Sequence, residues 1–264
     1  MDEQVAALAD RYSQRAEAYD SLWSPAILPF AVRLLDHLPL PGALQVLDVG
    51  TGAGALLPAI KRAAPGAVVS GIDSSEGMLQ LARARHQGPL ALMDAQSLEF
   101  PDDGFDVVIA AFVLFHLPDP GRCLDEICRV LRPHGAVGAL TWAEEEYPAA
   151  DTIWDEVLAD AGANVQPLAA TDSRMRSNTT AKMIALLKRA GFSHIQAWME
   201  RVEYRWQAAR HFQYHIGSTS RARLSSLTAA DRDLCLQRVA ERLSDAADDD
   251  YVFRGAVVFS TAVK

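Results

Sequence analysis

The first half of the chain alternates short apolar runs with longer segments of helical spacing, and Gly and Pro residues mark the ends of those segments. Such alternation is typical of βαβ units, which build a parallel sheet with helices packed against it. Pro58 lies inside the first helical segment, so we expect a local distortion there. Strands are expected at residues 44–49, 67–72, 90–93, 105–110 and 135–140, and helices near 53–64, 75–87 and 122–131.

The hydrophobic spacing changes outside this alternating region. Residues 5–38 carry apolar positions at helical spacing, which indicates helices that lie over the core. Beyond Trp142 the alternation of strand and helix patterns stops. Helices are expected there at residues 151–161, 179–190, 208–216 and 229–243, and long strands at 193–206 and 251–263.

Composition narrows the classes of protein to consider. Of the 264 residues, 50% are hydrophobic and 22% are charged, so the chain can bury a sizeable core. The formal net charge of -9 disfavours binding to a nucleic-acid backbone, because such binding depends on clustered Lys and Arg. The acidic run Asp248-Asp249-Asp250 is expected to form a solvated loop and not a metal site.

The cysteines and the lengths of the apolar runs indicate in which cellular compartment the protein is expected. Cys123, Cys128 and Cys235 form no Cys-x-x-Cys pair and are odd in number, so neither a zinc knuckle nor a disulfide framework is indicated. The sequence has no basic stretch followed by an apolar one at its start, and no run of about 18 apolar residues. We expect a soluble, cytoplasmic monomer or homodimer without a membrane or nucleic-acid partner.

A glycine-rich segment follows the first expected strand and reads Asp48-Val49-Gly50-Thr51-Gly52-Ala53-Gly54. Glycines allow a tight turn and let a ligand approach the backbone, so a nucleoside-type cofactor is expected here. The pattern Gly50-x-Gly52-x-x-Ala55 also satisfies the relaxed dinucleotide fingerprint. By itself it does not separate NAD(P) from S-adenosyl-L-methionine (SAM).

Acidic residues stand at or beside the ends of the first three expected strands and favour SAM. Asp48 would meet the positive end of a sulfonium-bearing amino acid, whereas it would repel a pyrophosphate. Asp73 can accept hydrogen bonds from both ribose hydroxyls, which suits either cofactor. Asp94 can accept from an adenine amine.

These motifs, taken in order, resemble those of class I SAM-dependent methyltransferases, and most of all the ubiquinone/menaquinone-biosynthesis and natural-product small-molecule branch. The resemblance covers roughly residues 12–142. One departure is His134, which stands where the family usually has Gly. The motifs are Leu47-Asp48-Val49-Gly50-Thr51-Gly52-Ala53-Gly54, Gly71-Ile72-Asp73-Ser74-Ser75, Met93-Asp94-Ala95, Phe105-Asp106-Val107-Val108 and Leu131-Arg132-Pro133-His134-Gly135.

The resemblance implies an α/β, Rossmann-like fold whose seven-stranded sheet is mostly parallel with an antiparallel final strand and has helices on both faces. We expect three parts: an N-terminal helical lid (1–42), a SAM-binding core (43–145) and a C-terminal part with substrate-pocket helices and the last two strands (146–264). The glycine loop is expected at the methionine portion, Asp73 at the ribose, and Asp94 with Ala95 at adenine. The full set of expected cofactor residues is Tyr12, Tyr19, Asp48, Gly50, Thr51, Gly52, Gly54, Asp73, Ser74, Met78, Asp94, Ala95 and Ala111.

For three of these residues, ordinary packing in the core is an alternative to contact with the cofactor. Met78 suits an adenine contact or ordinary helix packing. Tyr12 and Tyr19 share a helical face and resemble the N-terminal aromatic gate of the family, although core packing would also explain them.

The candidate catalytic and acceptor residues come from loops and from the second half of the chain. His116, after the fourth strand, and His211 are candidate bases, and either can be a structural histidine. His211 and His215 are spaced for one helix face, but no Glu follows His211 and no third ligand is evident, so no metal is expected. The expected acceptor pocket comprises Phe115, Trp142, Trp206 and His215.

The predicted function is methyl transfer from SAM to oxygen, nitrogen or carbon of a small-molecule acceptor, in biosynthesis. Two alternatives are a SAM- or S-adenosylhomocysteine-binding protein without transfer activity and an NAD(P)-dependent oxidoreductase. Phe112-Val113-Leu114-Phe115 stands where methyltransferases of bases or glutamine carry an Asn/Asp-Pro-Pro-Tyr segment, which disfavours those substrates.

Overall fold

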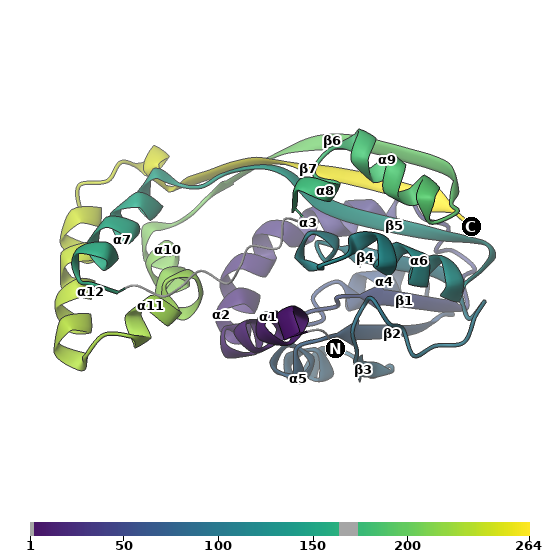
Figure 1. The fold of residues 1–264 in the computed structure, drawn as a ribbon, viewed down its shortest axis with the longest axis horizontal. Helices are drawn as coiled ribbons and strands as arrows, with labels where there is room; N and C mark the ends of the chain where they lie inside the picture. The colour runs from purple at the N-terminus through teal and green to yellow at the C-terminus, as the bar shows by residue number, and fades with distance from the viewer. Residues whose placement is uncertain (1–2, 164–173) are drawn as a thin grey trace.

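The computed structural model describes residues 3–163 and 174–264. Seven strands form one sheet in the order β3-β2-β1-β4-β5-β7-β6 (Figure 1). Strand β7 runs antiparallel to both of its neighbours, and the other adjacent strands pair in parallel. The predicted fold class is therefore confirmed. The strands are β1 (Gln45–Val49), β2 (Val68–Asp73), β3 (Leu90–Leu92), β4 (Phe105–Ala111), β5 (Leu131–Glu146), β6 (Ser193–Arg205) and β7 (Val252–Val263).

Two hydrophobic layers cover the two faces of the sheet. Side chains alternate along a strand, so Val107 and Ile109 of β4 pack on one face and Val108 and Ala110 on the other. The first face is covered by helices α3 (Ser24–Leu35) and α4 (Leu57–Ala63), and the second by α6 (Pro120–Val130) and α9 (Thr180–Arg189). Burial on both faces explains why these strands read as continuous apolar runs.

The helical segment expected near residues 53–64 is shorter than predicted. Helix α4 begins at Leu57, and residues 53–56 belong to the loop before it. Pro58 therefore lies in the first turn, where an α-helix needs no backbone N–H from it. The expected distortion at Pro58 was wrong.

Strand β5 is much longer than the predicted segment 135–140. It extends to Glu146 because β7 pairs with it antiparallel from Ala136↔Val263 to Glu146↔Arg254. The expected helix at 208–216 also changes character within its length. It is α-helical as α10 (Ala208–Tyr214) and continues as a π-helical turn, η3 (His215–Thr219).

A group of helices lies beyond the sheet, at the far ends of β5, β6 and β7 (Figure 1). It has a hydrophobic core of its own around Trp154, which is fully buried. The acidic run expected as a loop forms one 3-10 turn, η4 (Asp248–Tyr251), beside this group. The group comprises α7 (Ala149–Asp160), α10, η3, α11 (Arg221–Ser225) and α12 (Ala229–Leu243).

The N-terminal helices lie between this outer group and the sheet (Figure 1). Within the described part of the chain, no helix has the length and apolar character needed to cross a membrane. The remaining elements are α1 (Glu3–Gln14), α2 (Ala16–Ala18), the π-helical turn η1 (Tyr19–Trp23), α5 (Glu76–Arg85), the 3-10 turn η2 (Leu114–His116) and α8 (Arg174–Ser177).

Candidate active site

The glycine loop after β1 is held in a conformation that favours glycine. Gly50 and Gly52 have φ values of 71° and 55°. A Cβ added at Gly50 would lie 2.7 Å from Val113, so this glycine allows close packing. A Cβ added at Gly52 would meet no atom of the described residues within 4 Å. Gly52 therefore borders open space into which ligand atoms can fit.

Asp48 lies under this loop at the end of β1. Its side chain is buried, and its Oδ2 accepts a hydrogen bond of 2.7 Å from Thr51 Oγ1. Desolvation by burial raises the pKa of Asp48 to about 7. A cationic group bound beside it would compensate that cost, because opposite charges attract strongly where water is excluded.

Asp73 ties the end of β2 to the glycine loop. Its Oδ2 accepts from the Gly52 backbone N–H at 2.8 Å, and its Oδ1 accepts from that of Ser75 at 2.9 Å. Burial raises the pKa of Asp73 while these backbone hydrogen bonds lower it. Each carboxylate oxygen has two lone pairs, so both can also accept from a ligand hydroxyl.

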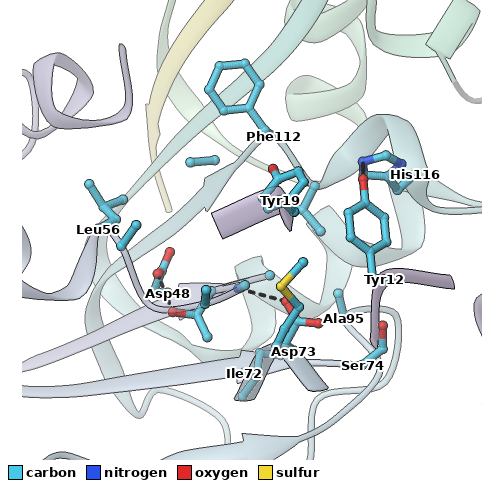
Figure 2. A pocket seen from close by; sticks show the side chains of 18 of the residues that line it. Tyr12, Tyr19, Asp48, Leu56, Ile72, Asp73, Ser74, Ala95, Phe112 and His116 are labelled. Carbon is cyan, nitrogen blue, oxygen red and sulfur yellow. Dashed lines mark hydrogen bonds between the residues drawn. The ribbon is translucent and has the colours of Figure 1, made fainter. Parts of the chain in front are cut away.

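A cavity lies at the carboxyl edge of the sheet, and most of the predicted cofactor residues line it (Figure 2). Met78 lines the cavity and also packs against Ala16 and Ala53, so it is part of the core, and its contact with adenine stays a prediction. Gly54 is not among the lining residues. A Cβ there would lie 3.1 Å from the Ala82 backbone, so Gly54 allows α5 to pack closely. The predicted residues that line the cavity are Tyr12, Tyr19, Asp48, Gly50, Thr51, Gly52, Asp73, Ser74, Met78, Asp94, Ala95 and Ala111.

The N-terminal helices contribute Tyr12 and Tyr19 to the wall of this cavity (Figure 2). Tyr12 Oη and His116 Nε2 are 2.9 Å apart and share a hydrogen bond. The rings of Tyr12 and Tyr19 meet edge to face with centroids 5.6 Å apart. The Arg15 guanidinium lies 4.0 Å from the centroid of the Tyr12 ring. Tyr12, which precedes His116 by 104 residues, thus reaches the 3-10 turn η2 that follows β4.

A second cavity, of about 510 Å³, adjoins the first and shares Tyr12, Tyr19, Phe112 and His116 with it. The outer helices and the ends of β5 and β7 provide much of its wall. Trp23 of η1 stacks on Trp206 with centroids 6.0 Å apart. The predicted acceptor residues Phe115, Trp142, Trp206 and His215 all line this cavity, as does His211.

Two π-helical turns contribute to the wall of the second cavity. Turn η1 contributes Tyr19 and Trp23 to the second cavity, and η3 contributes His215. A Cβ added at Gly217 of η3 would lie 2.6 Å from Ala18, so the outer group approaches the N-terminal helices closely. Single π-helical turns occur frequently at functional sites.

Phe112 and Asp151 are among the residues of the site that sequence reasoning missed. Phe112 has a φ of 60°, which is rare for a bulky residue and often marks a functional constraint. It lines both cavities, whereas in the sequence the segment Phe112–Phe115 indicated only which substrates are disfavoured. His134, at the departure from the family pattern, has a φ of 66°, which explains why Gly is usual there.

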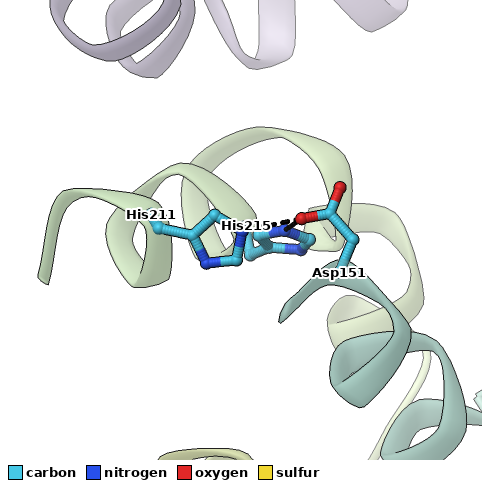
Figure 3. A group of neighbouring side chains, drawn as sticks. All are labelled: Asp151, His211 and His215. Carbon is cyan, nitrogen blue, oxygen red and sulfur yellow. Dashed lines mark hydrogen bonds and ion pairs between the residues drawn. The ribbon is translucent and has the colours of Figure 1, made fainter. Parts of the chain in front are cut away.

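Asp151 stands at the start of α7 and contacts both histidines of the predicted pair. Its Oδ1 lies 2.7 Å from His211 Nε2 and 3.1 Å from His215 Nε2 (Figure 3). The two imidazoles lower the pKa of Asp151 against the effect of burial. The expectation that the pair lacks a third potential ligand was therefore wrong, because Asp151 lies 60 residues before His211 and only folding brings it near.

Comparison with known proteins defines the class. A family model described as a methyltransferase domain matches residues 47–138. A demethylmenaquinone methyltransferase of Lactobacillus johnsonii is 32% identical over 170 residues, which cover 56% of this chain and 68% of that protein. The chain belongs to the class I SAM-dependent methyltransferases, in their ubiquinone/menaquinone and natural-product branch, and the cofactor of this family is SAM.

Other similarities are shorter or concern the fold. A nocamycin O-methyltransferase of Saccharothrix syringae is 38% identical over 135 residues, which cover 48% of each chain. The chain spans about half the length of the curated relatives it matches first. The solved structure of the [4+2]-cyclase SpnF is similar in fold, with a TM-score of 0.60, 20% identity, and coverage of 98% of this chain and 96% of that chain.

The residues of the first cavity fit SAM. The open space beside Gly52 can take ligand atoms, and the buried carboxylate of Asp48 suits a positively charged amino acid moiety. Asp73 has oxygens placed at the end of β2, where open α/β sheets bind the ribose of a nucleotide. Asp94 and Ala95, which follow the neighbouring strand β3, line the same cavity.

Proposed function

We propose that this protein transfers the methyl group of SAM to a small-molecule acceptor bound in the second cavity. The observation that carries the proposal is the junction of the two cavities, which share Tyr12, Tyr19, Phe112 and His116. Methyl transfer requires the acceptor atom in line with the methyl group and away from water. Two adjoining cavities with a common aromatic wall meet that requirement.

The roles of the residues follow from where they lie. When bound, SAM supplies an activated methyl group on a positively charged sulfur. Asp48 and Asp73 hold the cofactor's amino acid and ribose portions, and Gly52 leaves room for its backbone contacts. Tyr12 and Tyr19 exclude water at the junction. His116 takes the acceptor proton where the acceptor needs a base, because imidazole is suited to that task near neutral pH.

The acceptor that we propose is a small organic molecule. Its cavity is lined by aromatic side chains, among them Trp23, Trp142 and Trp206, which suit an apolar or aromatic body. The net charge of -9 argues against a nucleic-acid substrate. Two relatives of the chain are named as a demethylmenaquinone methyltransferase and a nocamycin O-methyltransferase, and these small-molecule acceptors support the proposal.

We also propose a division of labour among the three predicted parts. Residues 43–145 hold the cofactor and contribute Phe115 and Trp142 to the acceptor cavity, residues 1–42 border both cavities, and the outer helices of residues 146–264 shape the acceptor cavity. The residues that line only the second cavity, such as Trp206 and His215, support this division.

Incubation with methyl-labelled SAM and pools of phenols, quinols and amines tests the function. We expect label in at least one small-molecule product with the wild type, and none with Gly52→Val. Fold does not determine reaction, as the [4+2]-cyclase with this fold illustrates. If SAM binds but an acceptor is converted without gain of a methyl group, the proposal is wrong and the alternative of a SAM-binding protein without transfer holds.

A further inference from the structure

Asp151, His211 and His215 direct one potential ligand atom each toward a common point (Figure 3). Their ligand atoms all lie within 4.8 Å of one another. The two histidines are four residues apart, so His211 on α10 and His215 at the start of η3 face the same side, and Asp151 approaches from α7. Two imidazoles and one carboxylate form a donor set that divalent transition metals favour.

The surroundings of the two rings hold them in place. His215 Nδ1 is 2.9 Å from Ser220 Oγ, which is the kind of outer hydrogen bond that orients a metal-binding imidazole. Trp154 stacks on His215 with centroids 4.7 Å apart, and Tyr251 lies edge to face against His211 at 5.3 Å. Both imidazoles are almost fully buried. The cluster is therefore preorganised and does not depend on mobile surface side chains.

Both Nε2 atoms approach the same oxygen, Asp151 Oδ1. Without an ion, each ring carries its proton on Nε2 and donates to this oxygen, which has two lone pairs. With an ion, both Nε2 lone pairs and the carboxylate bind it together, and each ring carries its proton on Nδ1. Buried His211 Nδ1 has no hydrogen-bond partner in the described part of the chain in either case, so the choice between the two rests on the donor set and on experiment.

The two separations that involve Asp151 can be compared with those of a tetrahedral site. Bonds of about 2.1 Å in tetrahedral geometry place two ligand atoms roughly 3.4 Å apart. The separation of 3.1 Å between Asp151 Oδ1 and His215 Nε2 is close to that value, and the 2.7 Å to His211 Nε2 must widen by roughly 0.7 Å.

We propose that Asp151, His211 and His215 bind one divalent transition-metal ion, such as Zn²⁺, at the wall of the second cavity. All three residues line that cavity, so the remaining coordination positions face it. An oxygen or nitrogen of a molecule bound in the cavity can occupy such a position. Binding of the ion by itself does not depend on methyl transfer, so this proposal can fail while the proposed function stands, and the reverse.

Metal binding by the full-length protein tests the proposal directly. The protein is stripped with a chelator and titrated with Zn²⁺ by calorimetry, and with Co²⁺, whose visible spectrum reports the ligand type and geometry. We expect one ion per chain in the wild type and a Co²⁺ spectrum typical of nitrogen and oxygen ligands. Asp151→Asn and His215→Asn should each weaken binding at least about 100-fold.

His134→Asn is the matched control. His134 is exposed near the start of β5, and Asn tolerates its φ of 66°, so binding should equal that of the wild type. Circular dichroism melting of each variant separates loss of the ligand from loss of the fold. Absence of stoichiometric binding in the wild type overturns the proposal and leaves a hydrogen-bonded His–Asp–His cluster. A thiolate charge-transfer band, or full binding by folded Asp151→Asn, would also overturn it.

Discussion

Individual residues at the strand ends carry the chemistry of this protein, and their environment determines how they act. Asp48 and Asp94 are both carboxylates that line the first cavity, but Asp48 is buried and Asp94 is half-buried. Desolvation by burial raises the pKa of Asp48 to about 7. A sequence pattern identifies the carboxylate, and only its burial determines its charge state.

Asp48 should give the cofactor-free protein a distinct pH dependence. Its native pKa of about 7 exceeds the unfolded value of 3.8, so the native state holds the proton more tightly. The free energy of unfolding therefore falls as pH rises from about 4 through about 7, by about 1.4 kcal/mol for each unit of pKa difference. Asp48→Asn cannot ionise and should lack this component of the slope.

Urea denaturation of both proteins at about pH 5 and about pH 8, without cofactor, measures this difference. The Asp48→Asn variant should gain stability relative to the wild type at the higher pH, because only the wild type has to bury a charge there. Parallel pH profiles for wild type and variant would show that Asp48 does not titrate as its burial indicates.

Gly52→Val should abolish cofactor binding while the protein stays folded. The valine side chain would fill the open space beside Gly52 and strain a backbone at a φ of 55°. Gly66→Val is the matched control, because a Cβ at Gly66 also meets no described atom within 4 Å and its φ is ordinary. Calorimetric titration with S-adenosylhomocysteine gives the dissociation constants. Wild-type affinity in a folded Gly52→Val protein would show that the ligand lies elsewhere.

At the scale of elements, the outer helices are the feature that turns a cofactor-binding sheet into a site with an acceptor cavity. They have their own hydrophobic core around Trp154 and reach the rest of the protein through the long strands β5, β6 and β7. Trp206, just after β6, belongs to that core and also to the cavity wall. Packing of this group should affect acceptor binding more than cofactor binding.

Trp206→Ala tests that separation. The change removes the stacking on Trp23 and Tyr214 and enlarges the second cavity. We expect a raised KM for the acceptor or a lowered kcat, with SAM affinity within about threefold of wild type, a change under about 1 kcal/mol. Both constants are measured on one preparation, after melting curves establish that it is folded. Equal losses of SAM affinity and turnover would contradict the division between core and outer helices.

At the scale of the whole molecule, the topology brings together groups that are distant in sequence. The parallel strands end at one edge, where their loops form the first cavity, and the N-terminal helices cover it with Tyr12 and Tyr19. A ligand bound there contacts the sheet, the glycine loop and the lid together. Its binding energy should therefore add to the stability of the folded chain.

S-adenosylhomocysteine at about 100 times its dissociation constant should stabilise the native state by about 2.7 kcal/mol, since it binds the folded chain only. For a chain of this length, that corresponds to a rise in melting temperature of roughly 5–10 °C. NAD(P)H at the same concentration serves as the control and should produce no shift. A shift with NAD(P)H and none with S-adenosylhomocysteine would point to the oxidoreductase alternative.

The sequence by itself determined the alternating strands, the glycine loop and the acidic strand ends, because these depend on local periodicity and on turns whose residues are adjacent. The Asp48–Gly54 segment and Asp73 could be assigned to a cofactor site because each lies within a few residues of an expected strand end. Helix α4 shows the limit of such reasoning. Its start depended on how the glycine loop packs, and Pro58 turned out to lie at the helix beginning.

Tertiary structure decided what depends on contacts between distant segments. The lengthening of β5 comes from its antiparallel pairing with β7, more than 100 residues later. The hydrogen bond between Tyr12 and His116 and the approach of Asp151 to His211 have the same origin. No periodicity links such residues, because their proximity arises from the strand order and from helix packing. The acceptor cavity and the Asp151–His211–His215 cluster therefore became visible only in the folded chain.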